Sequence, residues 1–254
     1  DGKTTNNGAC LCNGKGTFST AKNLYCYALT NGASTACSTT PIASEKMLSS
    51  QINMKDDINL QYINAMAVSA DSKHVYAVAT GSKSVIFWSR DAYTGVLTNQ
   101  VEYKDDTFFE NVQSLTLSPD GKNMYIVAKK SIVHFDRDKN TGILTNQVNS
   151  YFDPNIQITD VKVSFDGKHV YVTTGVPSSI VYFDRDADSG HLTKKVELLQ
   201  PGVLQSMVVS SNGKHAYAVA TTGNSVYKFD RNPETGNLTG PIKCNSNNLL
   251  VPTS

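Results

Sequence analysis

Oxygen-bearing side chains stand at alternate positions in two short segments, a spacing that could wrap a calcium ion. The segments are Asp136-Arg-Asp138-Lys-Asn140-Thr-Gly142 and Asp184-Arg-Asp186-Ala-Asp188-Ser-Gly190. In both, the glycine falls one place later than in an EF-hand loop, and no glutamate stands at the twelfth position. The favoured interpretation is that these side chains cap a tight turn. Calcium binding is the alternative, and no metal ligand is assigned.

The five histidines do not form a metal site either. His74, His169 and His215 stand at the same position of successive repeats, so the repeat geometry keeps them further apart than a shared metal would allow. His134 lies in an apolar segment, where packing explains it. No loop rich in glycine is suited to cradling a phosphate, and we therefore expect no cofactor.

Four of the five cysteines lie in the first 37 residues, and the last stands near the other end of the chain. They are Cys10, Cys12, Cys26, Cys37 and Cys244. Such clustering favours disulfides that staple one weak unit, and hence an oxidising, secreted or cell-surface location. Inert thiols are the second interpretation. Zinc is disfavoured because Cys10-Leu11-Cys12 lacks the two-residue gap of zinc knuckles.

Cys26 and Cys37 flank a predicted turn at Asn31-Gly32 almost symmetrically. Directly opposed residues of a hairpin bring their Cβ atoms close to the separation that a disulfide spans, so a Cys26–Cys37 bridge is predicted. Cys244 is expected to pair with Cys10 or Cys12 and to lock the two ends of the chain together. One thiol is then left over.

The charge balance excludes some partners. Lys and Arg number 23 against 22 for Asp and Glu in 254 residues, so no overall field attracts nucleic acid. Apolar runs are only a few residues long, far below the roughly 20 that a membrane helix needs, so membrane insertion is not expected.

An internal repeat organises most of the chain. A strand, a tight turn and a second strand recur as VSADSKHVYAV, LSPDGKNMYIV, VSFDGKHVYVT and VSSNGKHAYAV. A third strand follows in each, as in SIVYFDRD, and then a fourth, as in TGILTNQ. The turn residues Asp71, Asp120, Asp166 and Asn212 are 49, 46 and 46 residues apart. A fixed period of this size is typical of propeller blades, and Asp-Gly or Asn-Gly suits their two-residue hairpins.

A fifth, degenerate copy is found when Asn13-Gly14-Lys15 is aligned with Asn212-Gly213-Lys214. GTFST then matches HAYAV, and NLYCYAL matches SVYKFDR. The fold class predicted is all-β, a β-propeller of about five four-stranded blades in one domain over residues 1–254. The blades are expected at about 7–43, 60–104, 111–151, 156–200 and 203–244, with an irregular insertion at about 44–59.

The DGK turns, the Tyr-Val strands and FDRDxxTGxLT resemble the YVTN-repeat propellers, the group that includes the 6-phosphogluconolactonase-like lactonases. The resemblance extends from Tyr62 to Thr239 and implies the propeller fold. Members usually have seven blades. Either the ring closes here with five blades, or the chain is part of a larger ring or array; five are favoured because the five units are in phase and each begins with its innermost strand.

The resemblance also implies a possible hydrolytic site on the loops at the mouth of the propeller. A lactonase could use a carboxylate to activate water and a cation to stabilise an oxyanion. The acids expected there are Glu102, Asp105, Asp106, Glu110 and Asp153, and the bases are Lys129, Lys130, Lys194 and Lys195. A solvated rim explains the same residues and is favoured.

Two classes of function are weighed. The favoured one is a non-enzymatic extracellular binding or structural module whose partner is a protein, a carbohydrate or copies of itself. The reasons are polar loops, 12 tyrosines and the absence of a reactive cluster. Contact candidates are Tyr103, Phe108, Phe109, Tyr151 and Phe152, and packing between blades is the favoured explanation for any single one of them. Asn237, in the sequon Asn237-Leu238-Thr239, is the candidate for glycosylation. The alternative function is a lactonase-like hydrolase of sugar lactones.

Overall fold

The computed structural model describes residues 60–128, 131–151, 156–200 and 202–244, together with five short strands outside these ranges. The chain divides into two compact units, Asp1–Met54 and Lys55–Ser254. The sequence predicted one domain over residues 1–254. The boundary between the two units falls inside the segment 44–59 that was predicted as an irregular insertion.

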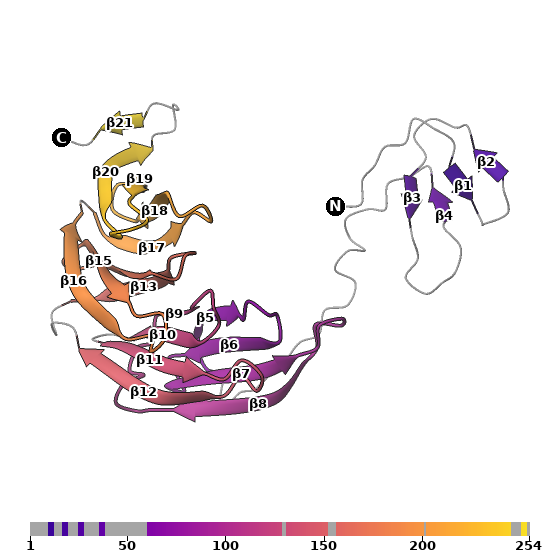
Figure 1. Ribbon diagram of the computed structural model, residues 1–254, viewed down its shortest axis with the longest axis horizontal. Helices are drawn as coiled ribbons and strands as arrows, with labels where there is room; N and C mark the ends of the chain where they lie inside the picture. Colours follow the sequence, from indigo (N-terminus) through magenta and orange to yellow (C-terminus); the bar gives the residue numbers. More distant parts are fainter. Residues whose placement is uncertain are drawn as a thin grey trace. The chain divides into compact units, whose positions relative to one another are not determined.

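The second unit contains four four-stranded antiparallel blades within the described residues (Figure 1). The first blade is β5 (Ile63–Val68), β6 (His74–Ala79), β7 (Ser84–Arg90) and β8 (Leu97–Lys104), and the second is β9 (Ser114–Leu117), β10 (Asn123–Ala128), β11 (Ser131–Arg137) and β12 (Leu144–Tyr151). The third is β13 (Ile158–Val163), β14 (His169–Thr174), β15 (Ser179–Arg185) and β16 (Leu192–Leu199). The last is β17 (Leu204–Val209), β18 (His215–Ala220), β19 (Ser225–Arg231) and β20 (Leu238–Cys244), and β21 (Leu250–Pro252) pairs with β20. The described residues contain no helix, so the all-β propeller fold predicted from the repeats is confirmed.

The first unit contains β1 (Cys10–Cys12), β2 (Thr17–Ser19), β3 (Tyr25–Tyr27) and β4 (Ala36–Ser38). β1 pairs with β2, and β3 pairs with β4, in two separate two-stranded sheets. The described strands of segment 7–43 therefore form two hairpins rather than the four-stranded fifth blade predicted there. These strands are three residues long, against six to eight in most strands of the blades.

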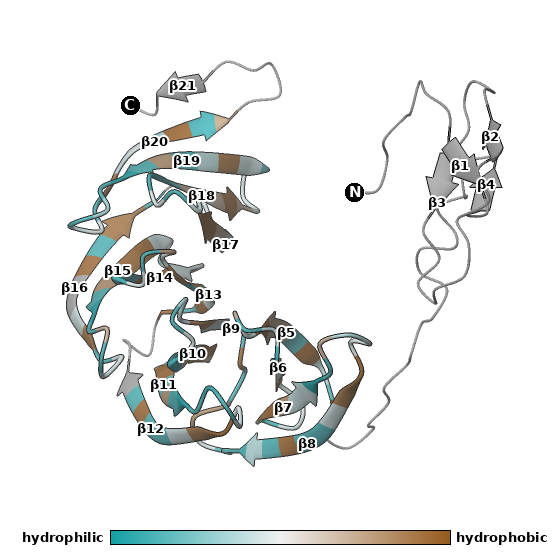
Figure 2. Cartoon of the chain, turned by 45° about the vertical axis from the view of Figure 1, so that its right-hand side comes forward, coloured by the Kyte–Doolittle hydropathy of each residue, from teal (hydrophilic) through white to brown (hydrophobic). Residues whose placement is uncertain are grey.

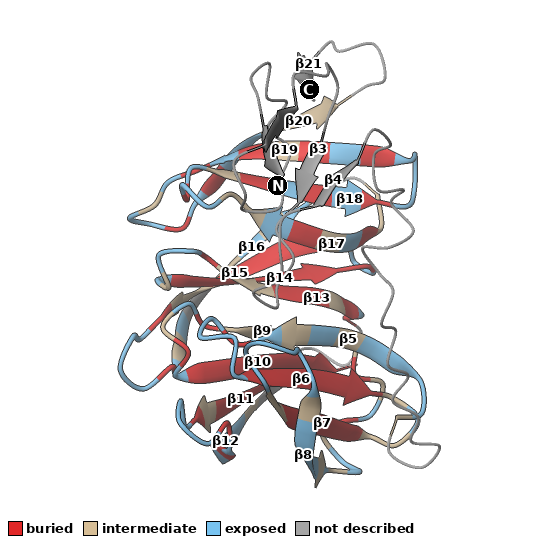
Figure 3. Ribbon diagram, turned by 90° about the vertical axis from the view of Figure 1, so that its right-hand side faces the viewer, coloured by how far each residue is buried: buried red, intermediate tan, exposed pale blue. Residues whose placement is uncertain are grey.

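Neighbouring blades of the second unit pack through their first strands, because β5 contacts β9, β9 contacts β13, and β13 contacts β17. The second strands β6, β10 and β14 are buried along their whole length, as Figure 3 shows for β6 and β10. Their alternating β-branched and aromatic residues suit a pleated surface with a neighbour on each side. The fourth strands alternate hydrophilic and hydrophobic residues (Figure 2), as expected of strands with one face in water.

The turn between the first and second strands is built as the Asp-Gly pattern predicted. In the second blade, the Ser118 hydroxyl donates to the Asp120 carboxylate at 2.5 Å, and Asp120 accepts the Lys122 backbone N–H at 3.0 Å. Gly121 has φ of +71°, a conformation that costs glycine little. The same serine and acid recur in the turns of the first and third blades.

Candidate functional site

In the second, third and last blades, an arginine at the end of the third strand ties its blade to the blade before it. Arg137, from the second blade, donates from Nε to the Tyr76 hydroxyl of the first blade at 2.7 Å. Its Nη2 lies 2.7 Å from Nδ1 of His74, and its Nη1 donates to the Gly121 carbonyl at 2.9 Å. Tyr76 in turn donates to the Gly142 carbonyl at 2.7 Å. We call this set the inter-blade network.

The inter-blade network repeats at the next two seams. Arg185 contacts Tyr125 at 3.0 Å and the carboxylate of Asp120 at 3.0 Å. Arg231 contacts Tyr171 at 2.7 Å and the carboxylate of Asp166 at 3.0 Å. The three arginines are at most 6% exposed, and each buried guanidinium is satisfied by acceptors from two blades.

Burial raises the pKa of Tyr76, Tyr125 and Tyr171 to about 12, so these hydroxyls stay protonated and donate to the glycine carbonyls. Burial also lowers the pKa of His74, and the Arg137 guanidinium lowers it further. The pKa of His169 is lowered by burial and by Arg231. A neutral imidazole can accept a hydrogen bond from the guanidinium through Nδ1, which a charged one cannot.

These histidines predict how stability depends on pH. A group whose pKa is lower in the folded chain than its ordinary value of 6.5 takes up its proton first in the unfolded chain. The contribution of His74 and His169 is therefore complete above pH of about 6.5 and is lost as the pH falls below it. We expect the urea concentration at the midpoint of unfolding to decrease as the pH is lowered from 7.5 to 5. Tyrosine fluorescence measures the unfolding.

The variant His74→Asn tests this assignment, since Asn123 occupies the same position in the second blade and accepts a hydrogen bond from Arg185. We expect His74→Asn to reduce the loss of stability toward pH 5. His191→Asn, at an exposed position, is the matched control and should leave the loss unchanged. Equal behaviour of the two variants would contradict the role of the buried histidine.

A second polar group, the inner cluster of Ser114, Asp160, Lys162 and Ser206, joins the first strands of three blades. Asp160 on β13 is 4% exposed and accepts hydrogen bonds on both carboxylate oxygens. Oδ1 accepts from the Ser114 hydroxyl at 2.6 Å and from the Lys162 ammonium at 2.7 Å. Oδ2 accepts from the Ser206 hydroxyl at 2.5 Å. Backbone N–H groups of Val161 and Met207 complete the set at 2.9 and 3.1 Å.

Asp160 and Lys162 therefore differ in what they can do. The Asp160 carboxylate is occupied by five donors and holds the first strands of three blades together. The Lys162 side chain is 31% exposed, so its ammonium is fixed at one side by Asp160 and open to solvent at the other. A cation held in this way can stabilise a developing oxyanion.

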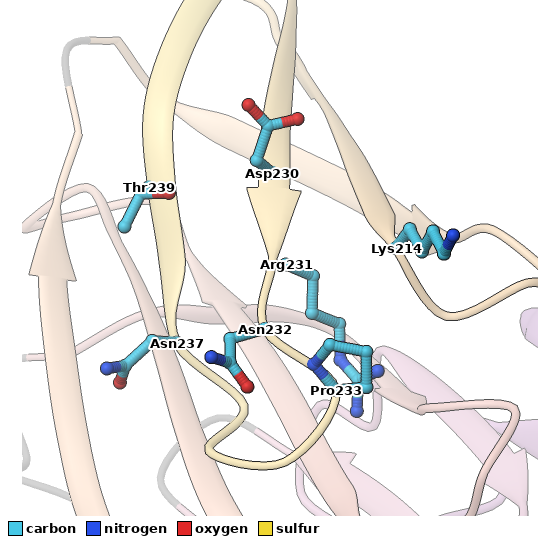
Figure 4. Close-up of a pocket in the computed structure, with 7 residues that line it drawn as sticks. All are labelled: Lys214, Asp230, Arg231, Asn232, Pro233, Asn237 and Thr239. Carbon is cyan, nitrogen blue, oxygen red and sulfur yellow. The ribbon is translucent and has the colours of Figure 1, made fainter.

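A pocket of about 530 Å³ lies on the last blade (Figure 4). It is lined by Lys214, Asp230, Arg231, Asn232, Pro233, Asn237 and Thr239. The Asp230 carboxylate lies 2.7 Å from the Lys228 ammonium and 3.6 Å from Nε2 of His215. The hydrogen bond from Lys228 lowers the pKa of Asp230, so this carboxylate is a weak base.

The segments weighed as calcium loops are capped turns. Asp138 accepts the backbone N–H groups of Asn140 and Thr141 at 2.8 Å each, and Asp186 does the same for Asp188 and Ser189. Within the described residues, no three His, Cys, Asp or Glu side chains are placed to hold a metal ion. The turn-capping interpretation thus accounts for the motif.

The acids and bases expected at the mouth do not form one cluster in the described part of the chain. Asp105 caps the turn at Thr107 and Phe108 and accepts from Gln147. Asp106 faces Lys83 at 3.8 Å, while Glu102 and Glu110 are exposed. Asp153, Lys129 and Lys130, and the side chains of Lys194 and Lys195, lie outside the described residues.

The aromatic candidates for ligand contact are built into the packing between the first two blades. Phe109 is 1% exposed, and Tyr103 and Phe108 pack against the same core. The Tyr103 ring stacks on Phe87 with centroids 6.1 Å apart. Phe109 thus fills space between the two blades, and Tyr103 and Phe108 lie half-buried against the same core. Their contact with a ligand stays a prediction. The side chain of Tyr151 and the whole of Phe152 lie outside the described residues.

Asn237 lies on the turn before β20, is exposed, and accepts a hydrogen bond from the Tyr182 hydroxyl. Its glycosylation stays a prediction. In the first unit, Cys26 lies directly opposite Cys37 in the β3–β4 register, the backbone pairing on which the predicted bridge depends. The side chains of Cys10, Cys12, Cys26 and Cys37 are outside the described residues.

Cys244 is a free, half-buried thiol in the structure. The bond predicted from it to Cys10 or Cys12 involves side chains outside the described residues and stays a prediction. Cys244 is paired with Val226 of β19 on one side and with Leu250 of β21 on the other. Cys244 thus has a strand partner on each side.

Sequence reasoning missed the inter-blade network and the inner cluster. A signal was present for both. Arginine ends the third strand in all four clear repeats, and Asp160 is the one acid at a position occupied elsewhere by Ala65, Ser114 and Ser206. Neither pattern identifies the side chains that these residues contact, because those side chains lie on another blade.

Residues 148–246 match the family model described as "Lactonase, 7-bladed beta-propeller". The matched region covers the third and last blades with the end of β12. No curated protein gives a significant match.

Several solved structures share the fold. A candidate 6-phosphogluconolactonase from Bacteroides fragilis is 21% identical, with a TM-score of 0.61, over 70% of this chain and 52% of that one. The periplasmic gluconolactonase of Pseudomonas aeruginosa is 18% identical, with a TM-score of 0.61, over 71% and 53%. A protein from Lactobacillus plantarum is 21% identical, with a TM-score of 0.64, over 75% and 56%. The chain thus spans about half the length of these proteins.

These matches correct two expectations. The prediction of a non-enzymatic binding or structural module is wrong, because the family that matches is a family of lactonases, which are enzymes. The prediction of five blades differs from the seven that describe the family, and the described residues contain four. Among the described residues, no helix is long and apolar enough to cross a bilayer. Over residues 148–246 the chain is similar to the seven-bladed lactonase propellers, and the resemblance predicted from its repeats is confirmed.

Proposed function

We propose that this protein is a lactonase-like hydrolase that acts on sugar lactones. The observation that carries the proposal is the match of residues 148–246 to the lactonase family model. Supporting it are similar structures described as a candidate 6-phosphogluconolactonase and as a gluconolactonase. Because the chain spans about half of those proteins, their substrates enter here as a hypothesis about substrate class.

Lactone hydrolysis depends on a positively charged or hydrogen-bonding group that stabilises the carbonyl oxygen, and the reaction itself consumes only water. Water attacks the carbonyl carbon, the ring C–O bond breaks, and the product is a hydroxy acid that releases a proton at neutral pH. Negative charge develops on the carbonyl oxygen in the transition state. We assign its stabilisation to Lys162, because its ammonium is held at 2.7 Å by the buried Asp160 carboxylate and is partly open to solvent.

The experiment is a pH-stat assay of gluconolactone and 6-phosphogluconolactone with the spontaneous rate subtracted. We expect saturable hydrolysis by the 254-residue chain. Lys162→Met should lower kcat by about 100-fold with little change in KM, the effect of removing one oxyanion donor. The chain offers a matched control in Lys228→Met, since Lys228 forms the same 2.7 Å contact with an aspartate two residues away, on β19.

The two parts of the proposal fail separately. Lack of saturable hydrolysis by the wild-type chain on every lactone tested would overturn the proposed function. Hydrolysis that Lys162→Met and Lys228→Met reduce equally would leave the function standing and remove Lys162 from the site.

We also propose that the protein works in an oxidising compartment, secreted or at the cell surface. One of the similar structures is a periplasmic protein. The support from this chain is the opposed register of Cys26 and Cys37 in the first unit.

A further inference from the structure

A polar residue interrupts the pairing between the first and second strands of the blades. In the first, third and last blades the register shifts at Asn64, Thr159 and Gln205, and each of these is an extra residue with no partner opposite it. β-Bulges of this kind re-aim a side chain and are frequent next to functional sites. Gln113 stands at the same position in the second blade, where its backbone N–H donates to the Val127 carbonyl at 2.8 Å. We call Asn64, Gln113, Thr159 and Gln205 the bulge row.

The bulge row differs in composition from the positions beside it. The position before the row is apolar in every blade and holds Ile63, Val112, Ile158 and Leu204. The position two places after the row is also apolar and holds Met66, Leu115, Val161 and Met207. The row itself is an uncharged amide or hydroxyl in all four blades, and none of its side chains is buried. Amides and hydroxyls both donate and accept hydrogen bonds, which suits a neutral partner that does the same.

The inner cluster aligns three members of the bulge row with one another. Each of the three directly precedes a residue of that cluster: Gln113 precedes Ser114, Thr159 precedes Asp160, and Gln205 precedes Ser206. Both serine hydroxyls donate to the Asp160 carboxylate, at 2.6 and 2.5 Å, and so hold β9, β13 and β17 in a fixed alignment. Figure 2 shows these as the innermost strands of their blades. The three side chains therefore come from equivalent points of neighbouring inner strands.

The Lys162 ammonium is directed toward the same end of the inner strands. It reaches back along β13 to the Asp160 carboxylate at 2.7 Å, and Asp160 follows Thr159 in the chain. In the third blade this end of the first strand lies beside the end of the second strand, where Ile158 pairs with Thr174. The cation assigned to the carbonyl oxygen and the bulge row are thus neighbours along β13.

The bulge row has hydrogen-bonding capacity to spare. Within the described residues, nothing forms a hydrogen bond with the exposed Gln205 amide. Oδ1 of Asn64 accepts from the Thr80 hydroxyl at 3.0 Å, which fixes the amide and leaves its Nδ2 able to donate. Nε2 of Gln113 donates to Oδ1 of Asn111 at 2.9 Å, which leaves its Oε1 able to accept. The row therefore offers both donors and acceptors.

We propose that the bulge row determines specificity for sugar lactones by forming hydrogen bonds with the hydroxyls of the lactone ring. The inference rests on the proposed function, in which Lys162 stabilises the carbonyl oxygen. A sugar lactone carries its hydroxyls on the ring carbons next to and beyond the carbonyl. A ring whose carbonyl lies at Lys162 can therefore extend its hydroxyls toward the row. A larger number of blades would lengthen the row and leave these four positions unchanged.

The test compares gluconolactone with δ-valerolactone in pH-stat assays of the 254-residue chain. δ-Valerolactone has the same six-membered lactone ring and no hydroxyl. We expect Gln205→Ala and Asn64→Ala each to lower kcat/KM for gluconolactone by about 5- to 10-fold through a higher KM, the effect of losing one neutral hydrogen bond. The kcat/KM for δ-valerolactone should stay unchanged in both variants.

Asn140→Ala is the matched control. It removes an exposed amide from the hairpin between β11 and β12, at the opposite end of the second blade from the bulge row, and should change neither rate. Circular dichroism of each variant checks that the blades are folded. A general disturbance of the fold would slow both lactones alike, so a loss confined to gluconolactone reports recognition of the hydroxyls.

Binding is measured separately by saturation-transfer NMR with methyl glucoside, a neutral pyranose that has the hydroxyls but no lactone carbonyl. We expect the wild-type chain to bind it and Gln205→Ala to bind it more weakly. Binding of methyl glucoside by a chain that hydrolyses no lactone would support the bulge row and overturn the proposed function. Hydrolysis of gluconolactone that both variants leave unchanged, or an equal loss on the two lactones, would overturn the bulge row and leave the proposed function standing. A wild-type chain that neither binds methyl glucoside nor prefers gluconolactone to δ-valerolactone would also overturn the bulge row.

Discussion

Arg185→Ala is expected to lower the free energy of unfolding by about 3–5 kcal/mol, the range for removing one partner of a buried ion pair. The Arg185 side chain is 1% exposed and lies 3.0 Å from the Asp120 carboxylate. It also donates to the Tyr125 hydroxyl and to the Gly167 carbonyl. Its removal leaves these acceptors buried between two blades without a donor. Urea denaturation followed by circular dichroism measures the change.

Lys122→Ala is the control for Arg185→Ala, because Lys122 also forms an ion pair across the same seam. Its partner is Asp188 at 3.6 Å, but Lys122 is 46% exposed and Asp188 is 98% exposed. Surface pairs of this kind contribute little to stability. We expect Lys122→Ala to stay within about 0.5 kcal/mol of the wild type. A comparable loss in both variants would mean that burial of the arginine is not what stabilises the seam.

The fold could be predicted from the sequence because each blade is specified locally. The Asp-Gly turn, the Tyr-Val strand and the third strand lie within about 30 residues of one another, and the period repeats them. Strands β5 to β20 accordingly fall where the repeats place them. The first unit was harder, since its segments match the repeat in few positions, and the pairing of β1 with β2 and β3 with β4 does not extend to a full blade.

The contacts between blades could not be predicted from the same pattern. Arg137 and Tyr76 are 61 residues apart. Because the same arginine and tyrosine recur in every clear repeat, the sequence alone does not say which tyrosine a given arginine contacts. The arginines were therefore interpreted as part of a hairpin motif. Once the order of blades is known, the direction of each contact follows: the arginine binds the tyrosine of the preceding blade.

The prediction of a non-enzymatic module failed for a related reason. It depended on the absence of a reactive cluster in the sequence, but groups on a propeller come together from several blades. Asp160 illustrates this, since its partners Ser114 and Ser206 each lie 46 residues away. Single residues on separate repeats carry no motif that a linear search can find.

Asp160→Ala is expected to lower the free energy of unfolding by about 3–5 kcal/mol. The carboxylate accepts from Ser114, Lys162 and Ser206, and two backbone N–H groups bind the same oxygens. Alanine leaves these donors facing a buried space, and the ammonium loses its counter-charge. Because the donors come from three first strands, the loss falls on two seams at once. Urea denaturation at neutral pH measures it.

The matched control is Asp230→Ala, which removes the carboxylate from the Lys228–Asp230 pair. That pair has the same 2.7 Å separation and the same spacing along its strand, but Asp230 is 58% exposed, whereas the Asp160 side chain is 5% exposed. Water replaces the lost partner at Asp230, so its effect should be far smaller. Double substitution of Asp160 by alanine and Lys162 by methionine should recover part of the loss, because the buried carboxylate and its ammonium are then removed together. Additive losses in the double variant would show that Asp160 acts through the serines and backbone alone, and that it does not hold Lys162 in place.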